Sequence, residues 1–227
     1  GDASTSEGIF FETINAAGVM QVPLAVAIYD DGFGISVPIE LQTTKSSISE
    51  VLKGFEKEDN TNGVKIVKCK GWDYPGLVKT FKEGIDHCRN SHTTVVFHIY
   101  EVTQPQGHST SGSHERYKTK ERLNWENKYD SIFKMREWLL ETGIADLEML
   151  TEIEKSAKKR AKDAKNKAWK NYTNGYKNER EELMELLHRI DSKTNLQNMR
   201  RFDKVTKKVF PTRRSHLSFA KRLNLEI

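Results

Sequence analysis

The sequence predicts an α/β fold, in which a partial parallel sheet flanked by helices is followed by a helical C-terminal extension. Three observations support this class. Short apolar runs alternate with amphipathic segments over about the first hundred residues. The run PLAVAIY at residues 23–29 is continuously apolar, which is typical of a strand covered on both faces in a parallel sheet. From residue 126 onward the patterned segments have helical spacing.

The first expected element is a helix over residues 5–20. Residues 4–7 read Ser-Thr-Ser-Glu, which matches a capping box: Ser4 would cap the helix and Glu7 would reach back to it. The apolar strand at residues 23–29 follows. The sequence GFGIS ends this strand and leads into a polar loop at residues 42–49.

Two further strands are expected, at residues 64–69 and 93–100. Between them, Asp73 is placed to cap a helix that begins near Pro75. The apolar face of this helix consists of Leu77, Val78, Phe81, Ile85 and Cys88.

The C-terminal part is expected to be helical, with one helix ending near Gly143, a longer one at about residues 146–172 and a charged one at about 177–190. The apolar stripe of the long helix thins along its length, so its far end is expected to project from the domain. The predicted organisation is a first domain at residues 1–125, a helical segment completing it at 126–172, and a basic helical connector or tail at 173–227.

Charge is unevenly distributed. Residues 1–154 carry 16 Lys and Arg against 24 Asp and Glu, whereas residues 155–227 carry 21 against 8. Such asymmetry marks a nucleic-acid arm, a docking tail, or a solvated helical face followed by a linker. The solvated face is favoured over nucleic-acid binding, because the aromatic and glycine residues typical of RNA-binding tails are sparse there.

Cysteine usage and hydropathy indicate a protein of the cytoplasm. Cys69 and Cys88 have no CxxC or metal-site spacing, which favours free thiols in a reducing compartment over a disulfide or a zinc site. No apolar run is long enough to span a membrane, and no signal peptide is visible, so no membrane partner is expected.

Two acidic stretches are placed to form one metal-diphosphate site. In the first, GDAS at residues 1–4, small residues let the backbone approach a phosphate, and amides at a helix start point toward it. The second, DDGF at residues 30–33, follows the strand at 23–29, and ligands of open α/β sheets gather at such strand ends. Magnesium between the carboxylates and the diphosphate would reconcile their charges. Taken alone, either stretch is also compatible with an ordinary acidic turn.

These stretches resemble the alpha-type half of the decarboxylating component of thiamine-diphosphate-dependent 2-oxoacid dehydrogenases. GDAS and DDGFGIS resemble that family's cofactor motif, Gly-Asp-Gly followed further along by Asn-Asn. TSEG and Asn15 also fit, and TQPQGHSTSGSHERYKTKERLNWE at residues 103–126 resembles its active-site loop. The likeness covers residues 1 to about 170. GHSTS at 107–111 is closer to the branched-chain (2-oxoisovalerate) branch than to the pyruvate branch.

The resemblance implies oxidative decarboxylation of a 2-oxoacid and acyl transfer to lipoamide, with magnesium and thiamine diphosphate as cofactors. Asp2 and Asp31 would ligate magnesium through their carboxylates, and Phe33 through its backbone carbonyl. Ala3 and Ser4 would meet the diphosphate through backbone amides. The full cofactor-binding set implied is Gly1, Asp2, Ala3, Ser4, Asp31, Phe33, Ile35 and His108.

Ile35 would lie near the thiazolium ring. His108 is the implied catalytic residue: it would face the diphosphate and the substrate channel, and stabilise the anionic intermediate or assist transfer to the lipoyl group. Ser109 and Ser111 stand where eukaryotic relatives are regulated by phosphorylation.

Two departures from the family pattern change the chemistry of the site. Ala3 replaces the third glycine, which its small side chain permits. Asp30-Asp31 replaces Asn-Asn, and the extra carboxylate makes the metal site more anionic, which favours magnesium and repels the diphosphate.

The chain is further expected to be a piece of a larger protein, because a Gly-Asp pair of this kind normally follows a buried strand. Its implied partners are a beta-type half, which supplies a glutamate to the cofactor, a lipoyl-bearing acyltransferase core and a 2-oxoacid. Residues 173–227 resemble the connector found where the two halves are fused, and the fragment alone is expected to be inactive. The alternatives are a non-catalytic interaction or linker module acting through the basic tail, and a nucleic-acid binder.

Overall fold

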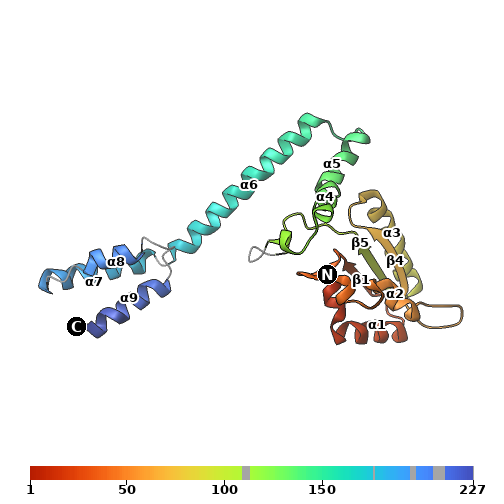
Figure 1. Ribbon diagram of the computed structural model, residues 1–227, viewed down its shortest axis with the longest axis horizontal. Coiled ribbons are helices and arrows are strands. Elements are labelled where there is room, and N and C mark those ends of the chain that lie inside the picture. Colours follow the sequence, from red (N-terminus) through yellow and green to blue (C-terminus); the bar gives the residue numbers. More distant parts are fainter. Residues whose placement is uncertain (109–112, 176, 195–197, 207–212, 227) are drawn as a thin grey trace. The chain divides into compact units, whose positions relative to one another are not determined.

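The computed structural model describes residues 1–108, 113–175, 177–194, 198–206 and 213–226. The chain divides into two compact units, Gly1–Leu150 and Thr151–Ile227 (Figure 1). The first contains a small parallel sheet flanked by helices and the second is helical, which confirms the predicted α/β class with a helical C-terminal part. The finer boundaries predicted at residues 125 and 172 stay predictions.

The sheet of the first unit has three parallel strands. Strand β5 (Val95–Tyr100) lies in the centre, between β1 (Ala25–Tyr29) and β4 (Lys65–Lys70). Both pairings are parallel, and Val95 lies opposite residue 25 of β1 and residue 65 of β4. The carboxyl ends of all three strands therefore meet at one edge of the sheet.

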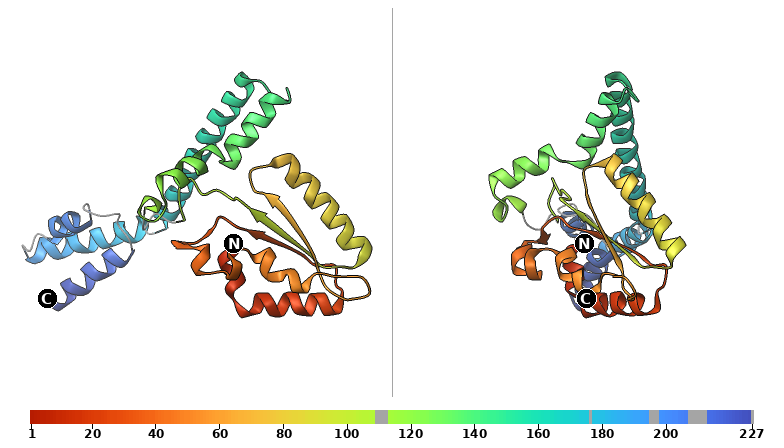
Figure 2. Two further views of the ribbon diagram at one scale, coloured as in Figure 1. Left: turned by 45° about the vertical axis from the view of Figure 1, so that its right-hand side comes forward. Right: turned by 90° about the vertical axis from the view of Figure 1, so that its right-hand side faces the viewer.

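Helices cover the sheet on opposite faces (Figure 2). Helix α1 (Gly8–Met20) and the short α2 (Ile48–Val51) pack on one face, and α3 (Tyr74–Ser91) packs on the other. Alternate residues of β5 enter the two cores, because side chains of a strand point to opposite faces. The first core consists of Ile14, Ile28, Ile48, Leu52, Val64 and Val96, and the second of Cys69, Cys88, Val95, Phe97 and Ile99.

The prediction that the strand at residues 23–29 is covered on both faces is wrong. Only Ile28 of β1 is buried, while Ala27 and Tyr29 are exposed. The reason is that β1 lies at the edge of the sheet and α3 packs over β4 and β5. The doubly covered strand is β5, in which residues 95–99 are all buried.

The predicted capping box at Ser4 and Glu7 is also wrong. Residues Asp2–Ser6 form a separate 3₁₀ helix, η1, and α1 begins at Gly8 without a side-chain cap. Backbone bonds satisfy this corner instead, since the amide of Glu7 donates to the carbonyl of Ser4 at 3.3 Å. By contrast, the predicted cap of α3 is confirmed: a carboxylate oxygen of Asp73 accepts from the amide of Gly76 at 3.1 Å.

Several short elements connect the main ones. Strands β2 (Phe33–Gly34) and β3 (Val37–Pro38) form a small antiparallel hairpin directly after β1. Helices α4 (Lys120–Lys128) and α5 (Ser131–Glu141) follow β5, so helical structure begins a few residues earlier than residue 126. The 3₁₀ helices after η1 are η2 (Ile39–Leu41), η3 (Thr44–Ser46), η4 (Leu52–Phe55) and η5 (His114–Arg116).

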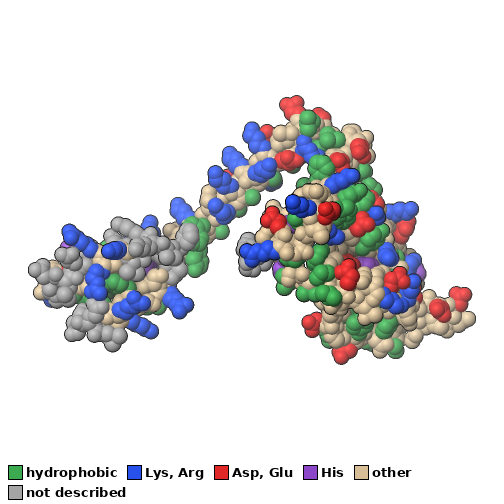
Figure 3. Space-filling model, viewed as in Figure 1, with side chains coloured by type: hydrophobic (Ala, Val, Ile, Leu, Met, Phe, Trp, Pro, Cys, Tyr) green, Lys and Arg blue, Asp and Glu red, His purple; other side chains and the backbone are tan. Residues whose placement is uncertain are grey.

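The second unit is built from helices. Helix α6 (Leu147–Asn174) begins in the first unit and continues into the second. Many Lys and Arg side chains lie along its length (Figure 3). Helices α7 (Lys177–Thr194), α8 (Asn198–Thr206) and α9 (Arg213–Glu226) follow. A small core of these helices consists of Leu187 on α7, Phe202 on α8 and Leu223 on α9.

Both cysteines, Cys69 and Cys88, are buried free thiols, as the sequence predicts. Within the described part of the chain, no helix is long and apolar enough to cross a membrane.

Candidate functional site

The N-terminal turn buries a carboxylate. Asp2 is 2% exposed, and η1 holds it in place: the hydroxyl of Thr5 donates to the backbone carbonyl of Asp2 at 2.6 Å. Among the described residues, the Oδ2 atom of Asp2 has no hydrogen-bond partner. A buried acceptor without a partner is costly, and it is a mark of a site that an ion or ligand completes.

Two further acidic residues lie at the end of β1. The sheet fixes Asp30, because its amide donates to the carbonyl of Ile99 at 2.8 Å and its carbonyl accepts from the amide of Val102 at 3.0 Å. The Asp31 carboxylate accepts from the amide of Phe33 at 3.3 Å. The acidic pair thus lies at the carboxyl end of a parallel strand, as predicted.

The carboxylates of the two acidic stretches are close enough to interact electrostatically. The pKa of Asp2 is raised to about 6, chiefly by burial and then by the negative charges of Asp30 and Asp31. Burial also raises the pKa of Asp31, while the amide of Phe33 and the positive charge of Lys118 oppose the rise. Carboxylates that repel one another in a partly dry site are a typical cation-binding arrangement.

The β2–β3 hairpin packs on the N-terminal turn. A Cβ atom on Gly34 would lie 3.3 Å from the Cβ of Ala3, so glycine permits this close approach. Phe33 pairs with Pro38 across the hairpin, and proline has no backbone N–H to donate to the carbonyl of Phe33. Ile35, at the tip, has a left-handed φ of 62° and an exposed side chain.

Two cations lie beside the acidic turn, Arg122 on α4 and Lys118 just before that helix. The guanidinium of Arg122 donates to the backbone carbonyl of Asp31 at 2.6 Å and to the carboxylate of Glu126 at 2.8 Å. Lys118 donates to both oxygens of Glu126, at 2.7 and 2.9 Å, and the side chains of this pair are each 1% exposed. Both cations also lie over the ring of Phe33, at 5.0 and 5.4 Å from its centroid.

Sequence reasoning missed this ionic cluster. A partial signal exists, since Arg122 and Glu126 stand four residues apart on a helix and can pair along it. The ring of Tyr117, which lies 5.7 Å from that of Phe33, extends the same contact surface.

The other predicted site residues are less closely tied to the acidic turn. Gly1 lies beside the end of β1, with an added Cβ 3.7 Å from the carbonyl of Tyr29. The amide of Ser4 donates to the carbonyl of Gly1 at 3.2 Å, so it would have to change partner to meet a phosphate. His108 is exposed, and no contact among the described residues joins it to Asp2 or Asp31.

Ser109 and Ser111 fall outside the described residues. Over the described ranges, there is no group of three or more His, Cys, Asp or Glu side chains arranged to hold a metal ion. A site here would therefore use backbone or ligand oxygens in addition to its carboxylates.

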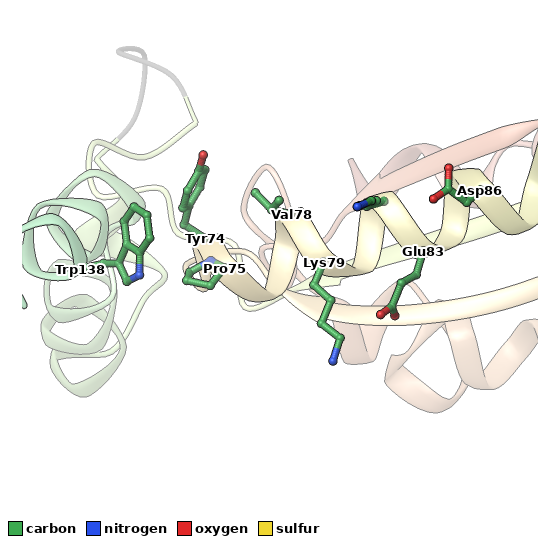
Figure 4. A pocket seen from close by; sticks show the side chains of 8 residues that line it. Tyr74, Pro75, Val78, Lys79, Glu83, Asp86 and Trp138 are labelled. Carbon is green, nitrogen blue, oxygen red and sulfur yellow. The ribbon is translucent and has the colours of Figure 1, made fainter. Parts of the chain in front are cut away.

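A separate hollow of about 570 Å³ lies on the outer side of α3 (Figure 4). Its apolar end is formed by Tyr74 and Trp138, whose ring centroids are 5.0 Å apart, and its rim carries charges of both signs. None of the predicted site residues lines it. The residues that do are Tyr74, Pro75, Val78, Lys79, Lys82, Glu83, Asp86 and Trp138.

Comparison with known proteins decides the family. The profile of the dehydrogenase E1 component family matches residues 1–176, which include both acidic stretches and the loop that carries His108. This chain belongs to the dehydrogenase E1 component family. The resemblance inferred from its motifs is thereby confirmed.

Curated relatives of this E1 chain are alpha subunits. It is 23% identical over 164 residues to the pyruvate dehydrogenase E1 component subunit alpha of Rickettsia bellii, covering 72% of this chain and 48% of the relative. The Bacillus subtilis subunit is 28% identical over 171 residues, covering 74% and 43%. The mitochondrial 2-oxoisovalerate dehydrogenase subunit alpha 2 of Arabidopsis thaliana is 26% identical over 145 residues, covering 63% and 29%. The chain spans less than half the length of each.

Proposed function

We propose that this chain forms the magnesium- and diphosphate-binding part of the decarboxylating component of a 2-oxoacid dehydrogenase. The observation that carries the proposal is the buried Oδ2 of Asp2, which has no partner among the described residues and belongs to a carboxyl group whose pKa is raised by burial and by the neighbouring Asp30 and Asp31 charges. A divalent cation would satisfy this oxygen and relieve the repulsion. Membership of the E1 family supports thiamine diphosphate as the ligand that the cation would bridge.

The donor set fits magnesium, which prefers carboxylate, carbonyl and phosphate oxygens. Asp2 and Asp31 would hold the ion through carboxylates. Phe33 would hold it through its carbonyl, which its cross-strand neighbour Pro38 cannot engage. Ala3 and Ser4 would present backbone amides to the diphosphate, the amide of Ser4 after release from the carbonyl of Gly1. When bound, thiamine diphosphate supplies the electron sink for decarboxylation of a 2-oxoacid.

The residues of the chain would then hold and neutralise charge. Ile35, exposed at the hairpin tip, would contact the ring portion of the cofactor. His108, exposed at the edge of its loop, would stabilise negative charge as it develops or assist acyl transfer to lipoamide. We further propose a beta-type half and a lipoyl-bearing acyltransferase core as partners, so that this chain by itself does not decarboxylate.

Calorimetric titration of thiamine diphosphate into the full chain, with and without magnesium, tests the proposal. We expect magnesium-dependent binding that weakens at least tenfold in Asp2→Ala and is unchanged in Asp59→Ala, an exposed carboxylate outside the site. Binding that ignores magnesium, or that survives loss of Asp2, would count against it. If the unaltered chain binds neither ligand, Asp31→Asn is titrated next: recovered binding would assign the failure to the extra carboxylate, and continued absence would overturn the proposal.

The basic tail supports a second candidate role for residues 173–227, as a connector or docking module. Its helices share a core of their own around Phe202, and its charge is strongly positive. Salt-sensitive association of the full chain with a beta-type partner, lost when the tail is removed, would support this role. Equal affinity for random DNA would favour the nucleic-acid alternative instead.

A further inference from the structure

A buried hydrogen-bonded chain runs from α2 across β5 to the end of β1. The hydroxyl of Ser49 lies 2.8 Å from Nδ1 of His98, and Nε2 of His98 lies 2.8 Å from Oδ2 of Asp30. The three residues are 4%, 2% and 6% exposed. The family resemblance assigns no role to Ser49 or His98.

The carboxylate of Asp30 fixes the position of one hydrogen of His98. A carboxylate only accepts, so Nε2 of His98 carries the hydrogen that is donated to Asp30. In the neutral ring, Nδ1 is then an acceptor and Ser49 donates to it. The order of groups is that of a hydrolytic triad, but a serine 4% exposed is closed to a substrate. The hydrogen bonds from Ser49 through His98 therefore orient the carboxylate of Asp30, and Ser49 is not placed to act as a nucleophile.

Both oxygens of Asp30 are occupied by protein donors. Its Oδ1 accepts from the amide of Gly32 at 2.8 Å, while Oδ2 accepts from His98. Asp2 differs in this respect, since one of its buried oxygens has no partner among the described residues. The distinguishing feature of Asp30 is thus that protein donors engage both of its carboxylate oxygens, one of them through the backbone amide of Gly32.

The backbone that Asp30 holds is the turn that carries the proposed metal ligands. Gly32 has a φ of 78°, a left-handed conformation, and its carbonyl accepts from the amide of Ile39 at 3.0 Å. The next amide, that of Phe33, donates to Asp31. Fixing Gly32 therefore fixes where the Asp31 carboxylate and the Phe33 carbonyl point.

We propose that His98 and Ser49 are positioning residues, which hold Asp30 as a fixed acceptor so that the turn at residues 30–33 presents Asp31 and Phe33 to a divalent cation. Asp30 itself is not a ligand. This inference rests on the proposed function for its consequence at the metal. The hold on the turn is a property of the protein alone, and it can be measured without any cofactor.

The test uses the full chain and Mn²⁺ as the probe, with free Mn²⁺ followed by electron paramagnetic resonance and exchange of the Gly32 amide followed by NMR. His98→Leu removes the donor, and we expect Mn²⁺ affinity to fall at least tenfold and the Gly32 amide to lose protection at least tenfold. His98→Gln keeps an N–H donor and should restore most of both. His188→Leu, at an exposed histidine on α7, is the matched control and should change neither.

Each outcome bears on the inference. Unchanged affinity and protection in His98→Leu would overturn it, as would equal losses in His98→Leu and His98→Gln. If unaltered protein binds no Mn²⁺, the consequence proposed at the metal fails, and the Gly32 amide still decides whether His98 holds the turn. Should His98→Leu not fold, Ser49→Ala takes its place, with an expected two- to fivefold loss of protection, and no loss would overturn the role of Ser49 and His98.

Discussion

Metal binding at Asp2 should depend on pH in a way that can be calculated. The pKa of Asp2 is raised to about 6, and magnesium requires the ionised carboxylate, so cation and proton compete for the same group. With a pKa of about 6, Asp2 is about 90% ionised at pH 7 and about 10% ionised at pH 5. The apparent affinity for the metal should therefore fall about tenfold between these two values.

In the metal-free protein the same shift affects folding stability with the opposite sign. The folded state binds the proton of Asp2 more tightly than the unfolded chain does, so this group favours folding most below about pH 4 and the advantage is lost as the pH rises to about 6. A shift of about two units corresponds to about 3 kcal/mol at most. Bound magnesium displaces this proton, so it should diminish the loss of stability between about pH 4 and pH 6.

Calorimetric titration with Mn²⁺ at pH 5, 6 and 7, in two buffers of different ionisation enthalpy, measures both affinity and proton release. About half a proton should be released per ion bound at pH 6, and almost none at pH 7. Asp2→Asn should abolish the pH dependence together with the binding, and Asp59→Asn, at an exposed site, should leave both intact. An affinity that is flat between pH 5 and 7, with no proton released, would refute the assignment of Asp2 as a ligand with a raised pKa.

Two predictions concern stability and are checked by denaturant unfolding. Lys118→Met leaves the carboxylate of Glu126 buried beside a single remaining cation, and should lower the free energy of unfolding by about 3 kcal/mol; a Lys118→Met/Glu126→Leu double variant should recover much of it, and an equal loss in both would contradict the reasoning. Gly84→Ala should cost about 1–3 kcal/mol, because its Cβ would lie 2.5 Å from the ring of Phe97. Gly54→Ala meets nothing within 4 Å and should stay within about 0.5 kcal/mol of the parent.

Sequence patterns predict those features that depend only on residues close together in the chain. The cap of α3 depends on Asp73 and an amide three residues on, and the acidic turn depends on a strand that ends beside it. Strand order does not follow from such patterns. The apolar run of β1 and that of β5 look alike in the sequence, but only β5 has a strand on each side, so the expectation of full burial was attached to the wrong strand.

The proximity of the two acidic stretches was predictable to the same extent, and their role as a binding site stays a proposal. The motif indicated Asp2 and Asp31, which the fold places in one electrostatic neighbourhood. The contacts that hold the turn were not predictable, since Arg122 is 91 residues from the Asp31 carbonyl it binds and His98 is 68 residues from Asp30. Contacts between residues so far apart in the chain leave no periodic pattern in the sequence from which they could be predicted.

The adjacent aspartates at the end of β1 illustrate how the fold can give identical residues different roles. Asp30 faces β5 and both of its oxygens accept from protein donors, whereas Asp31 lies near the positive charges of Lys118 and Arg122. The negative charge on Asp30 also raises the pKa of Asp2 more than that of Asp31 does. Replacing Asp30 by asparagine should therefore lower the pKa of Asp2 and weaken the hold on the turn, while the same change at Asp31 keeps an oxygen donor for the cation and removes only its negative charge. The substitution of Asp-Asp for Asn-Asn is thus two distinct changes, and each must be judged against its own neighbours.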